Sequence, residues 1–269
     1  MELAIAIVAF ICFFVFIYLP TQKRTGTETA DVVIFGDSIY ANECNGRYTA
    51  DYLRELTDRN IKDFSLGGTT MAFIDIDTTA GYLYDQCNMA AIADAFEASD
   101  FAVQKNAIYN KALTQDFAEK FDEMSKVDIA KVNTVVIGQM LNDYHAGVPI
   151  GDTVKGDDRY TYEGALRSVI RTFRKLNPNI RIFVTSATYT WYVQTGDTCE
   201  NNDFGGGYLE DYVSAAEKVC MDEGVTFVDL YHDLYDTNEE WSVYSADGLH
   251  PNNNGMEIIA RRIAEALSK

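Results

Sequence analysis

The sequence predicts a three-layer α/β/α domain built on a parallel β-sheet. Short runs of apolar and β-branched residues alternate along the chain with longer segments in which apolar residues recur at helical spacing. Helices that separate strands in this way act as crossover connections, which make the strands parallel and cover both faces of the sheet. With 269 residues, 47% of them hydrophobic and only four of them proline, the chain can form the core of one such domain.

Each element of this fold has its own signal. Five apolar runs predict strands at 31–35, 61–66, 132–138, 180–187 and 225–230. Helices are predicted at 47–58, over most of 81–126 with a polar break at 97–100, and at 161–176, 207–223 and 252–267. The helix at 161–176 carries its apolar residues on one face, and Asn177 and Pro178 end it.

An uncharged apolar segment, residues 3–19, precedes the domain and ends at Pro20. Its length is at the short end for a membrane-spanning helix. No basic segment comes before it and no small-residue cleavage site follows, so a signal peptide is disfavoured. A buried helix is the alternative, but so uniformly apolar a segment is unusual there. We predict three parts of the chain: a membrane anchor (1–20), a linker (21–29) and a folded domain (30–269).

The charge of the chain excludes some partners. The excess of 41 acidic over 22 basic side chains gives a net charge of −19. Such a surface repels phosphate backbones and anionic lipid headgroups, so nucleic acid is not an expected partner.

The cysteines do not indicate a metal or redox site. Cys12 lies in the apolar segment, and Cys44, Cys87, Cys199 and Cys220 lie in the domain. The four domain cysteines permit three disulfide pairings, but none has the close spacing of a zinc site or redox motif. We therefore expect ordinary buried thiols.

Candidate functional residues gather where the predicted strands end. Ligands of such folds bind beyond the carboxyl ends of the strands. Four blocks fall there or just before the last helix: Gly36-Asp37-Ser38, Gly67-Gly68-Thr69-Thr70, Met140-Leu141-Asn142-Asp143 and Asp247-Gly248-Leu249-His250-Pro251.

These blocks contain what a nucleophilic serine needs. Ser38 requires a base within hydrogen-bond reach that is itself oriented by a third group. His250 is the candidate base, and Asp247, three residues earlier, can hold its imidazole in the required tautomer. The backbone N–H groups of Ser38 and Gly68 can stabilise an oxyanion together with the Asn142 side-chain amide.

Taken together, the four blocks resemble those of a known family, the SGNH (GDSL-type) hydrolases. The resemblance rests on four blocks in this order: GDSIY, GGTT, LNDY and DGLHPN. The tripeptide GDS alone is common, whereas DGLHPN before the final helix is much more specific. The resemblance covers about residues 30–269 and implies a flavodoxin-like fold. It also implies a set of roles: Ser38 as nucleophile, Gly68 and Asn142 in the oxyanion hole, and Asp247 and His250 completing the triad.

Two blocks depart from the family pattern. The third block usually reads Gly-x-Asn-Asp, but here Met140 stands two residues before Asn142, and the nearest glycine is Gly138. The second block lacks the usual upstream Asn-x-Gly and has Asp63-Phe64-Ser65 instead. Both departures concern the shape of the acyl pocket.

Structural roles remain open for several of these residues. Ser38 can be the N-cap of the next helix, Asn142 and Asp143 can form an Asx-turn, and His250 can be a loop residue bonded to Asp247. His145, three residues after Asn142, can face a substrate or be a solvated loop histidine, and His232 is expected to be structural or on the surface. The residues Tyr189, Trp191 and Tyr192 form either an aromatic sugar platform or packing at the rim.

The sequence therefore predicts a membrane-anchored serine esterase that needs no metal or organic cofactor. Its expected substrate is a small-molecule or glycan ester, with acetyl as the expected acyl group. The alternatives are an O-acyltransferase acting on glycans, a lysophospholipase or lipase, and a catalytically silent glycan-binding module. An envelope glycan would place the domain outside the cytoplasm, whereas Lys23 and Arg24 favour the opposite orientation.

Overall fold

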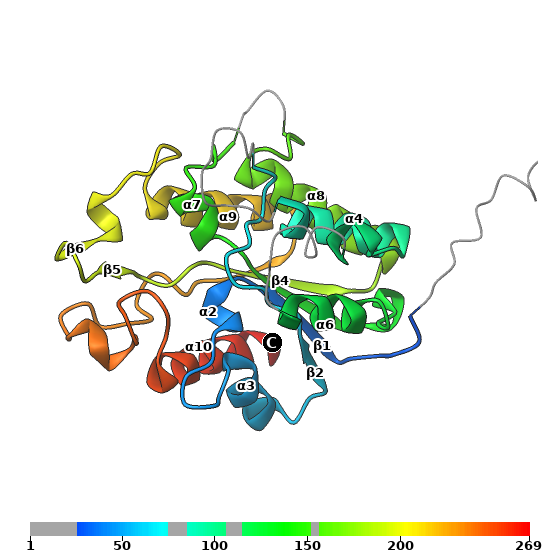
Figure 1. Cartoon of the computed structure of the whole chain (residues 1–269), viewed down its shortest axis with the longest axis horizontal. Helices are drawn as coiled ribbons and strands as arrows, with labels where there is room; N and C mark the ends of the chain where they lie inside the picture. The colour runs from blue at the N-terminus through cyan, green and yellow to red at the C-terminus, as the bar shows by residue number, and fades with distance from the viewer. Residues whose placement is uncertain (1–25, 75–84, 106–114, 152–155) are drawn as a thin grey trace, which may run out of the picture.

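The computed structural model describes residues 26–74, 85–105, 115–151 and 156–269. Within them the chain forms the predicted α/β/α sandwich (Figure 1). The predicted anchor at 1–20 and most of the linker lie outside the described residues. In the part of the chain that is described, no helix is both long and apolar enough to cross a membrane.

The central sheet has five parallel strands. They are β1 (Val32–Gly36), β2 (Ile61–Asp63), β3 (Thr134–Gly138), β4 (Arg181–Thr185) and β7 (Thr226–Val228), in the spatial order β2-β1-β3-β4-β7. All the predicted strands are confirmed, although β2, β4 and β7 are shorter than predicted. Beyond β2, Phe64 and Leu66 still donate backbone hydrogen bonds to carbonyl oxygens of β1 at 2.8 Å. β1 and β3 are buried along their whole length, which explains why their sequences are continuously apolar.

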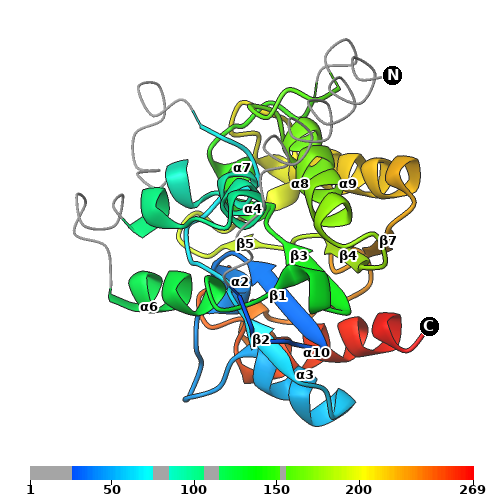
Figure 2. The same ribbon diagram turned by 90° about the vertical axis from the view of Figure 1, so that its right-hand side faces the viewer.

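Helices cover both faces of this sheet (Figures 1 and 2). On one face lie α3 (Thr49–Thr57) and α10 (Asn253–Leu267), and on the other α4 (Met89–Ala98), α8 (Tyr162–Leu176) and α9 (Leu209–Glu223). The helix α6 (Gln115–Met124) lies beside the β2 edge, where Lys120 donates a hydrogen bond to the Ser65 carbonyl oxygen. The predicted polar break coincides with the end of α4, and residues 106–114 lie outside the described part.

Several short elements are not predicted from the sequence. They are α2 (Ser38–Ala41), α7 (Leu141–His145), a two-stranded antiparallel hairpin of β5 (Trp191–Tyr192) and β6 (Asp197–Thr198), and the 3-10 helices η1 (Asp85–Cys87), η2 (Ile129–Lys131), η3 (Cys199–Asn201) and η4 (Trp241–Val243). Each has too few residues to show a period. Among them, α2 and α7 follow β1 and β3 directly and carry Ser38 and Asn142.

Aromatic rings join the sheet to one helical layer. The ring of Phe35 on β1 stacks on Phe173 of α8 with the centroids 5.4 Å apart, and it meets Phe96 of α4 edge-on at 5.7 Å. The predicted thiols Cys44, Cys199 and Cys220 are free, and Cys87, Cys199 and Cys220 are buried.

The strand order reverses between β1 and β3. The chain moves from β1 outward to β2 on one side, and from β3 outward to β4 and β7 on the other. This is the flavodoxin-like order, in which ligands bind at the carboxyl ends of the two strands where the reversal occurs. Ser38 and Asn142 follow these two strands.

Candidate active site

Ser38 begins the short helix that follows β1. The N-cap of this helix is Asp37, whose carboxylate accepts the N–H of Ile39 at 3.0 Å. The capping role that the sequence left open for Ser38 is therefore filled by Asp37. The Ser38 hydroxyl is hydrogen-bonded instead to a histidine from the other end of the chain.

Two glycines make room for the ring that holds α2 against the sheet. Gly36 and Gly138 are paired across β1 and β3, and a Cβ at either position would lie 2.4 Å from the Tyr40 ring. The Tyr40 hydroxyl and Thr185 Oγ1 are hydrogen-bonded at 2.7 Å. Gly138 thus serves the packing of the helix that carries Ser38, not a turn that aims Asn142.

His250 reaches Ser38 from the loop before α10. Its Nε2 lies 3.0 Å from Ser38 Oγ, and its Nδ1 lies 2.7 Å from Asp247 Oδ2. The other carboxylate oxygen of Asp247 accepts the backbone N–H groups of Leu249 at 2.9 Å and His250 at 2.7 Å. Burial alone would raise the pKa of Asp247, but the hydrogen bonds from His250 and Leu249 bring it below its ordinary value. The carboxylate is therefore ionised at neutral pH and fixes the imidazole orientation.

The loop that carries His250 is held by Ser245 and Gly248. Ser245 Oγ donates to the His250 carbonyl oxygen at 2.7 Å and accepts the Gly248 N–H at 2.8 Å. Gly248 has a φ of +90°, and a Cβ there would lie 2.4 Å from the Trp191 carbonyl oxygen. The sequence predicts a tight turn at Gly248, but not the approach of the hairpin. Nor does it reveal Ser245, because a hydroxyl that bonds only to backbone groups leaves no motif.

The predicted oxyanion-hole residues lie beside Ser38. A Cβ built on Gly67 would lie 3.7 Å from Ser38 Cβ, so this loop runs past the serine. Gly68 has a φ of +75°. In the described part of the chain, the backbone N–H groups of Ser38 and Gly68 have no protein acceptor. The Asn142 amide donates to the Thr69 carbonyl oxygen at 3.0 Å, which leaves its second N–H for a ligand.

A buried carboxylate next to Asn142 supports the same loop. Asp143 accepts the N–H groups of Met71 at 2.7 Å and Ala72 at 3.0 Å. Burial raises the pKa of Asp143 to about 7 and that of Asp37 to about 6. The sequence suggests an Asx-turn at this point, but the carboxylate instead joins α7 to a segment about seventy residues earlier, which no local pattern reveals.

The other histidines have different surroundings. His232 is on the surface, with Nδ1 2.8 Å from Asp229 and Nε2 3.0 Å from Glu210, in agreement with the structural role that the sequence favours. His145 is partly buried, and its Nε2 lies 2.9 Å from the Tyr192 hydroxyl. Among the described residues, no group of three or more His, Cys, Asp or Glu side chains could hold a metal ion.

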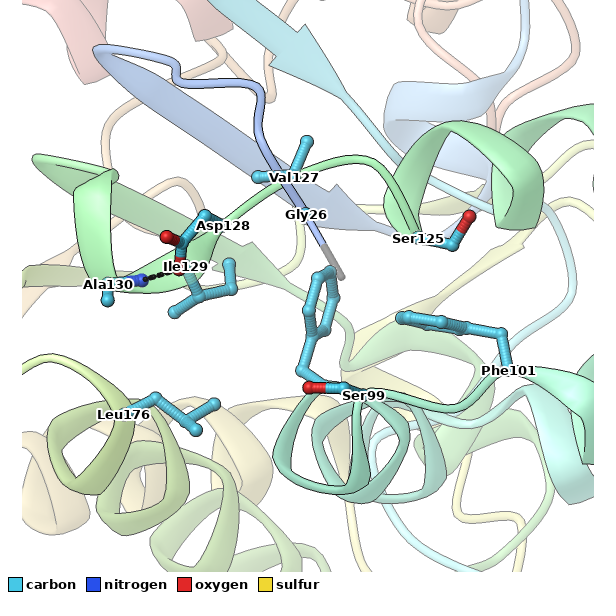
Figure 3. A pocket seen from close by; sticks show the side chains of 10 residues that line it. Gly26, Ser99, Phe101, Ser125, Val127, Asp128, Ile129, Ala130 and Leu176 are labelled. Atoms are coloured by element: carbon cyan, nitrogen blue, oxygen red, sulfur yellow. Dashed lines mark hydrogen bonds between the residues drawn. The ribbon is translucent and has the colours of Figure 1, made fainter. Parts of the chain in front are cut away.

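A small cavity lies at the opposite edge of the sheet from Ser38 (Figure 3). Its volume is about 30 Å³, which is room for a water molecule and little more. Several of its lining residues lie in segments that lead into strands: Gly26 comes before β1, Ile129 before β3 and Leu176 before β4. Ser38 follows β1, so this cavity belongs to the amino edge and not to the reactive groups.

A larger cavity, of about 620 Å³, adjoins the site. Gly67, which runs beside Ser38, and Asn42 form part of its lining. Lys120 and Phe117 of α6 contribute a charge and an aromatic ring to the opposite part. This cavity provides space for a polar group on the α3 and α6 side of Ser38.

The domain is a doubly wound α/β sandwich. A serine, a histidine and an aspartate lie in hydrogen-bond contact where its strand order reverses, which is the architecture of a serine hydrolase. The model of the GDSL-like lipase/acylhydrolase family matches residues 34–258. The chain belongs to this family and is an ester-hydrolysing enzyme.

Solved structures share this fold. A protein from Lactobacillus plantarum is 23% identical with a TM-score of 0.61, over 90% of this chain and 98% of its own. One described as a "possible lipase" from Chitinophaga pinensis DSM 2588 is 17% identical with a TM-score of 0.57, over 89% and 98%. A salicylyl-acyltransferase from a tetracycline biosynthetic pathway is 13% identical with a TM-score of 0.54, over 90% and 55%. No curated protein sequence matches the chain.

Proposed function

We propose that the chain is a serine esterase in which Ser38 is the nucleophile, His250 the general base and Asp247 the group that orients His250. The observation that carries the proposal is the hydrogen-bonded line from Asp247 through both ring nitrogens of His250 to Ser38 Oγ, with distances of 2.7 Å and 3.0 Å. A neutral imidazole held this way accepts a proton at Nε2, and the carboxylate stabilises the resulting imidazolium.

The reaction proceeds through an acyl-enzyme. Ser38 Oγ attacks the ester carbonyl carbon while its proton passes to His250, and the carbonyl oxygen becomes an oxyanion. The N–H groups of Ser38 and Gly68 and the Asn142 amide bind this oxyanion. When the ester bond breaks, His250 returns the proton to the departing alcohol. Water, activated by His250, then releases the acyl group from Ser38 as the free acid.

The proposed substrate is an acetyl ester on a carbohydrate or cell-envelope glycan. The predicted N-terminal tether and the resemblance to a family with short-acyl members support it. An O-acyltransferase would use the same acyl-enzyme but pass the acyl group to a sugar hydroxyl. A lysophospholipase would instead require a long acyl chain.

Labelling with a fluorophosphonate tests the nucleophile. The full-length protein should be labelled at Ser38, as read by mass spectrometry, and the Ser38→Ala variant should not. Ser214→Ala, which removes an exposed serine of α9, is the matched control and should label like the parent. If the folded protein is not labelled, or is labelled at a residue other than Ser38, then Ser38 has a structural role.

Acetate release then tests the substrate class. The full-length protein should release acetate from O-acetylated glycans, and p-nitrophenyl acetate should be cleaved faster than p-nitrophenyl decanoate. Cleavage of long-chain esters only would contradict the proposal and favour a lipase. Transfer of acetyl to an added glycan at a rate above that of hydrolysis would favour the acyltransferase.

We further propose that the domain is tethered with its active site facing away from the membrane, on the extracytoplasmic side. Thr27 and Glu28 donate their N–H groups to the Lys126 carbonyl oxygen, at 2.8 Å and 2.9 Å. These bonds hold the start of the described chain at the amino edge of the sheet, opposite Ser38. Retention of the full-length protein in carbonate-washed membranes tests the tether, and protease added outside intact cells tests the side. Release of the protein from the washed membranes would refute the tether. Protection of the domain from the added protease would refute its extracytoplasmic location.

A further inference from the structure

Three side chains near the site have no part in the steps above: His145, Tyr192 and Phe204, here called the His145 cluster. His145 ends α7 three residues after Asn142, so the two side chains share one face of that helix. The Tyr192 hydroxyl lies 2.9 Å from His145 Nε2. The Phe204 ring meets the His145 ring edge-on, with the centroids 5.1 Å apart.

The cluster lies on the His250 side of the site. The N–H of Trp191, next to Tyr192, donates to the Gly248 carbonyl oxygen at 2.8 Å, so the hairpin contacts the loop that carries His250. The charge of His250, after burial, is also among the causes that lower the pKa of His145. Figure 1 shows α7 and β5 at the same end of the sheet as α2.

This position is that of the leaving group. His250 takes the proton of Ser38 and delivers it to the oxygen of the departing alcohol. The alcohol must therefore lie on the His250 side of the scissile bond, whereas the carbonyl oxygen points to Gly68 and Asn142. A group bound by the His145 cluster is thus the alcohol and not the acyl chain.

The cluster offers neutral hydrogen-bonding groups. Burial, and secondarily His250, lowers the pKa of His145 to about 4, so its imidazole is uncharged at neutral pH. The Tyr144 hydroxyl donates to the Asn202 carbonyl oxygen at 2.7 Å and accepts from Tyr192 at 3.4 Å. Following these donor directions, Tyr192 accepts the N–H of His145 Nε2. The Nδ1 atom of His145 is then an acceptor for a ligand hydroxyl.

The segment that carries Phe204, the apolar member of the cluster, is held by backbone contacts. Asp203 Oδ1 accepts the N–H groups of Gly205 at 2.7 Å and Gly207 at 3.0 Å. Gly147 has a φ of +65°, and a Cβ there would lie 2.3 Å from the Phe204 carbonyl oxygen. The residue Phe204 nevertheless remains 44% exposed. An exposed ring beside polar groups suits a ligand with both C–H faces and hydroxyls.

The two other aromatic residues proposed from the sequence as a sugar platform have packing roles. Tyr189 is buried, with its ring 5.9 Å from that of Tyr231. Trp191 is stacked on Tyr235 at 6.0 Å. Of the three candidates, Tyr192 is the one that belongs to the His145 cluster.

We propose that the His145 cluster binds the alcohol part of the ester and that this alcohol is a sugar. The proposal rests on the serine-esterase function proposed above. Neutral groups and an exposed ring match the hydroxyls and C–H face of a pyranose. In a protein of net charge −19 they do not match a phosphate-bearing alcohol such as that of a lysophospholipid.

The test compares two acetyl esters with different alcohols, the mono-O-acetylated methyl glucosides and p-nitrophenyl acetate, by acetate release from the full-length protein. In Tyr192→Phe and His145→Gln, kcat/KM for the sugar esters should fall about tenfold more than for the aryl ester, as expected for one lost hydrogen bond. Methyl glucoside should inhibit aryl-ester cleavage competitively, and its inhibition constant should rise in both variants.

Matched controls are Tyr160→Phe, an exposed tyrosine, and His232→Gln, a surface histidine, which should behave like the parent. Equal losses on both esters would mean that the cluster only positions His250 and would overturn the proposal. Variants that retain full sugar-ester activity would overturn it too. If the parent cleaves neither ester and Ser38 is not labelled, the esterase function fails and this inference fails with it. Aryl-ester cleavage that depends on Ser38, without sugar-ester cleavage, refutes the sugar alone.

Discussion

Replacing Gly138 with alanine should destabilise the protein mainly through one side chain, Tyr40, since the other close contact, with Thr185 Oγ1 at 3.0 Å, is less severe. The new Cβ would lie 2.4 Å from the Tyr40 ring, which cannot move without losing its 2.7 Å hydrogen bond to Thr185. Overpacking of this kind costs about 1–3 kcal/mol, and the buried hydrogen bond adds about 1 kcal/mol. Alanine in a strand offsets about 0.5–1 kcal/mol of this relative to glycine. The net loss of about 1–3 kcal/mol corresponds to a decrease in Tm of roughly 3–10 °C.

Thermal unfolding and the rate of Ser38 labelling measure this effect together, since Tyr40 lies two residues after Ser38, the proposed nucleophile, in α2. Gly156→Ala is the matched control, because a Cβ there meets no atom of the described residues within 4 Å. In a Tyr40→Ala background, Gly138→Ala should cost much less, since only the 3.0 Å contact with Thr185 Oγ1 remains. The same loss in both backgrounds would refute the reasoning, because the glycine would then be needed for something other than the ring.

Two further substitutions test the loop of His250 and a surface ion pair. In Gly248→Ala the new Cβ would lie 2.4 Å from the Trp191 carbonyl oxygen, so Ser38 labelling should slow at least about tenfold. The control Gly196→Ala has a similar φ but open space around the Cβ, and its labelling rate should not change. Equal effects of the two substitutions on labelling would mean that backbone strain at positive φ, and not the contact with Trp191, is the cause. Burial lowers the pKa of His232, but its hydrogen bonds and ion pairs with Asp229 and Glu210 outweigh burial and raise that pKa. The stability that protonated His232 contributes is therefore fully present below the pKa of histidine in the unfolded chain, about 6.5. This contribution is lost as the pH rises through the higher pKa of the folded state. The difference in urea midpoint between the parent and His232→Gln should therefore shrink as the pH rises, and a difference that grows would contradict the assignment.

The parts of the fold that the sequence predicts are those with enough residues to show a pattern. The strand at 134–138 is a β-branched run buried on both faces, and the helix at 162–176 has one apolar face that the Phe173 ring completes. Ser38 and His250 were identified because the four blocks occur in order, not because of any local property. Their hydrogen bond joins residues that are 212 positions apart.

The rest depends on contacts that leave no periodic signal. The helices α2 and α7 have four and five residues, which is little more than one turn, so they cannot show a helical period. The packing role of Gly138 is set by the Tyr40 ring from another segment, whereas the sequence shows Gly138 only as the glycine nearest to Asn142. The partners of Asp143 and Ser245 are backbone groups, which any residue type supplies.

The two buried carboxylates next to the site show why its geometry depends on more than the three reactive residues. Asp37 and Asp143 are almost completely buried, and burial of a charged group is favourable only where hydrogen bonds replace water. Asp143 receives two backbone N–H bonds from the segment that follows the Gly68 loop, and Asn142 holds the carbonyl oxygen of Thr69 in the same loop. The residues of one short helix therefore include one proposed oxyanion donor and also fix the loop that carries another. An apolar residue at 143 would bury more easily, but it would leave those N–H groups without an acceptor and the Gly68 N–H without a defined direction.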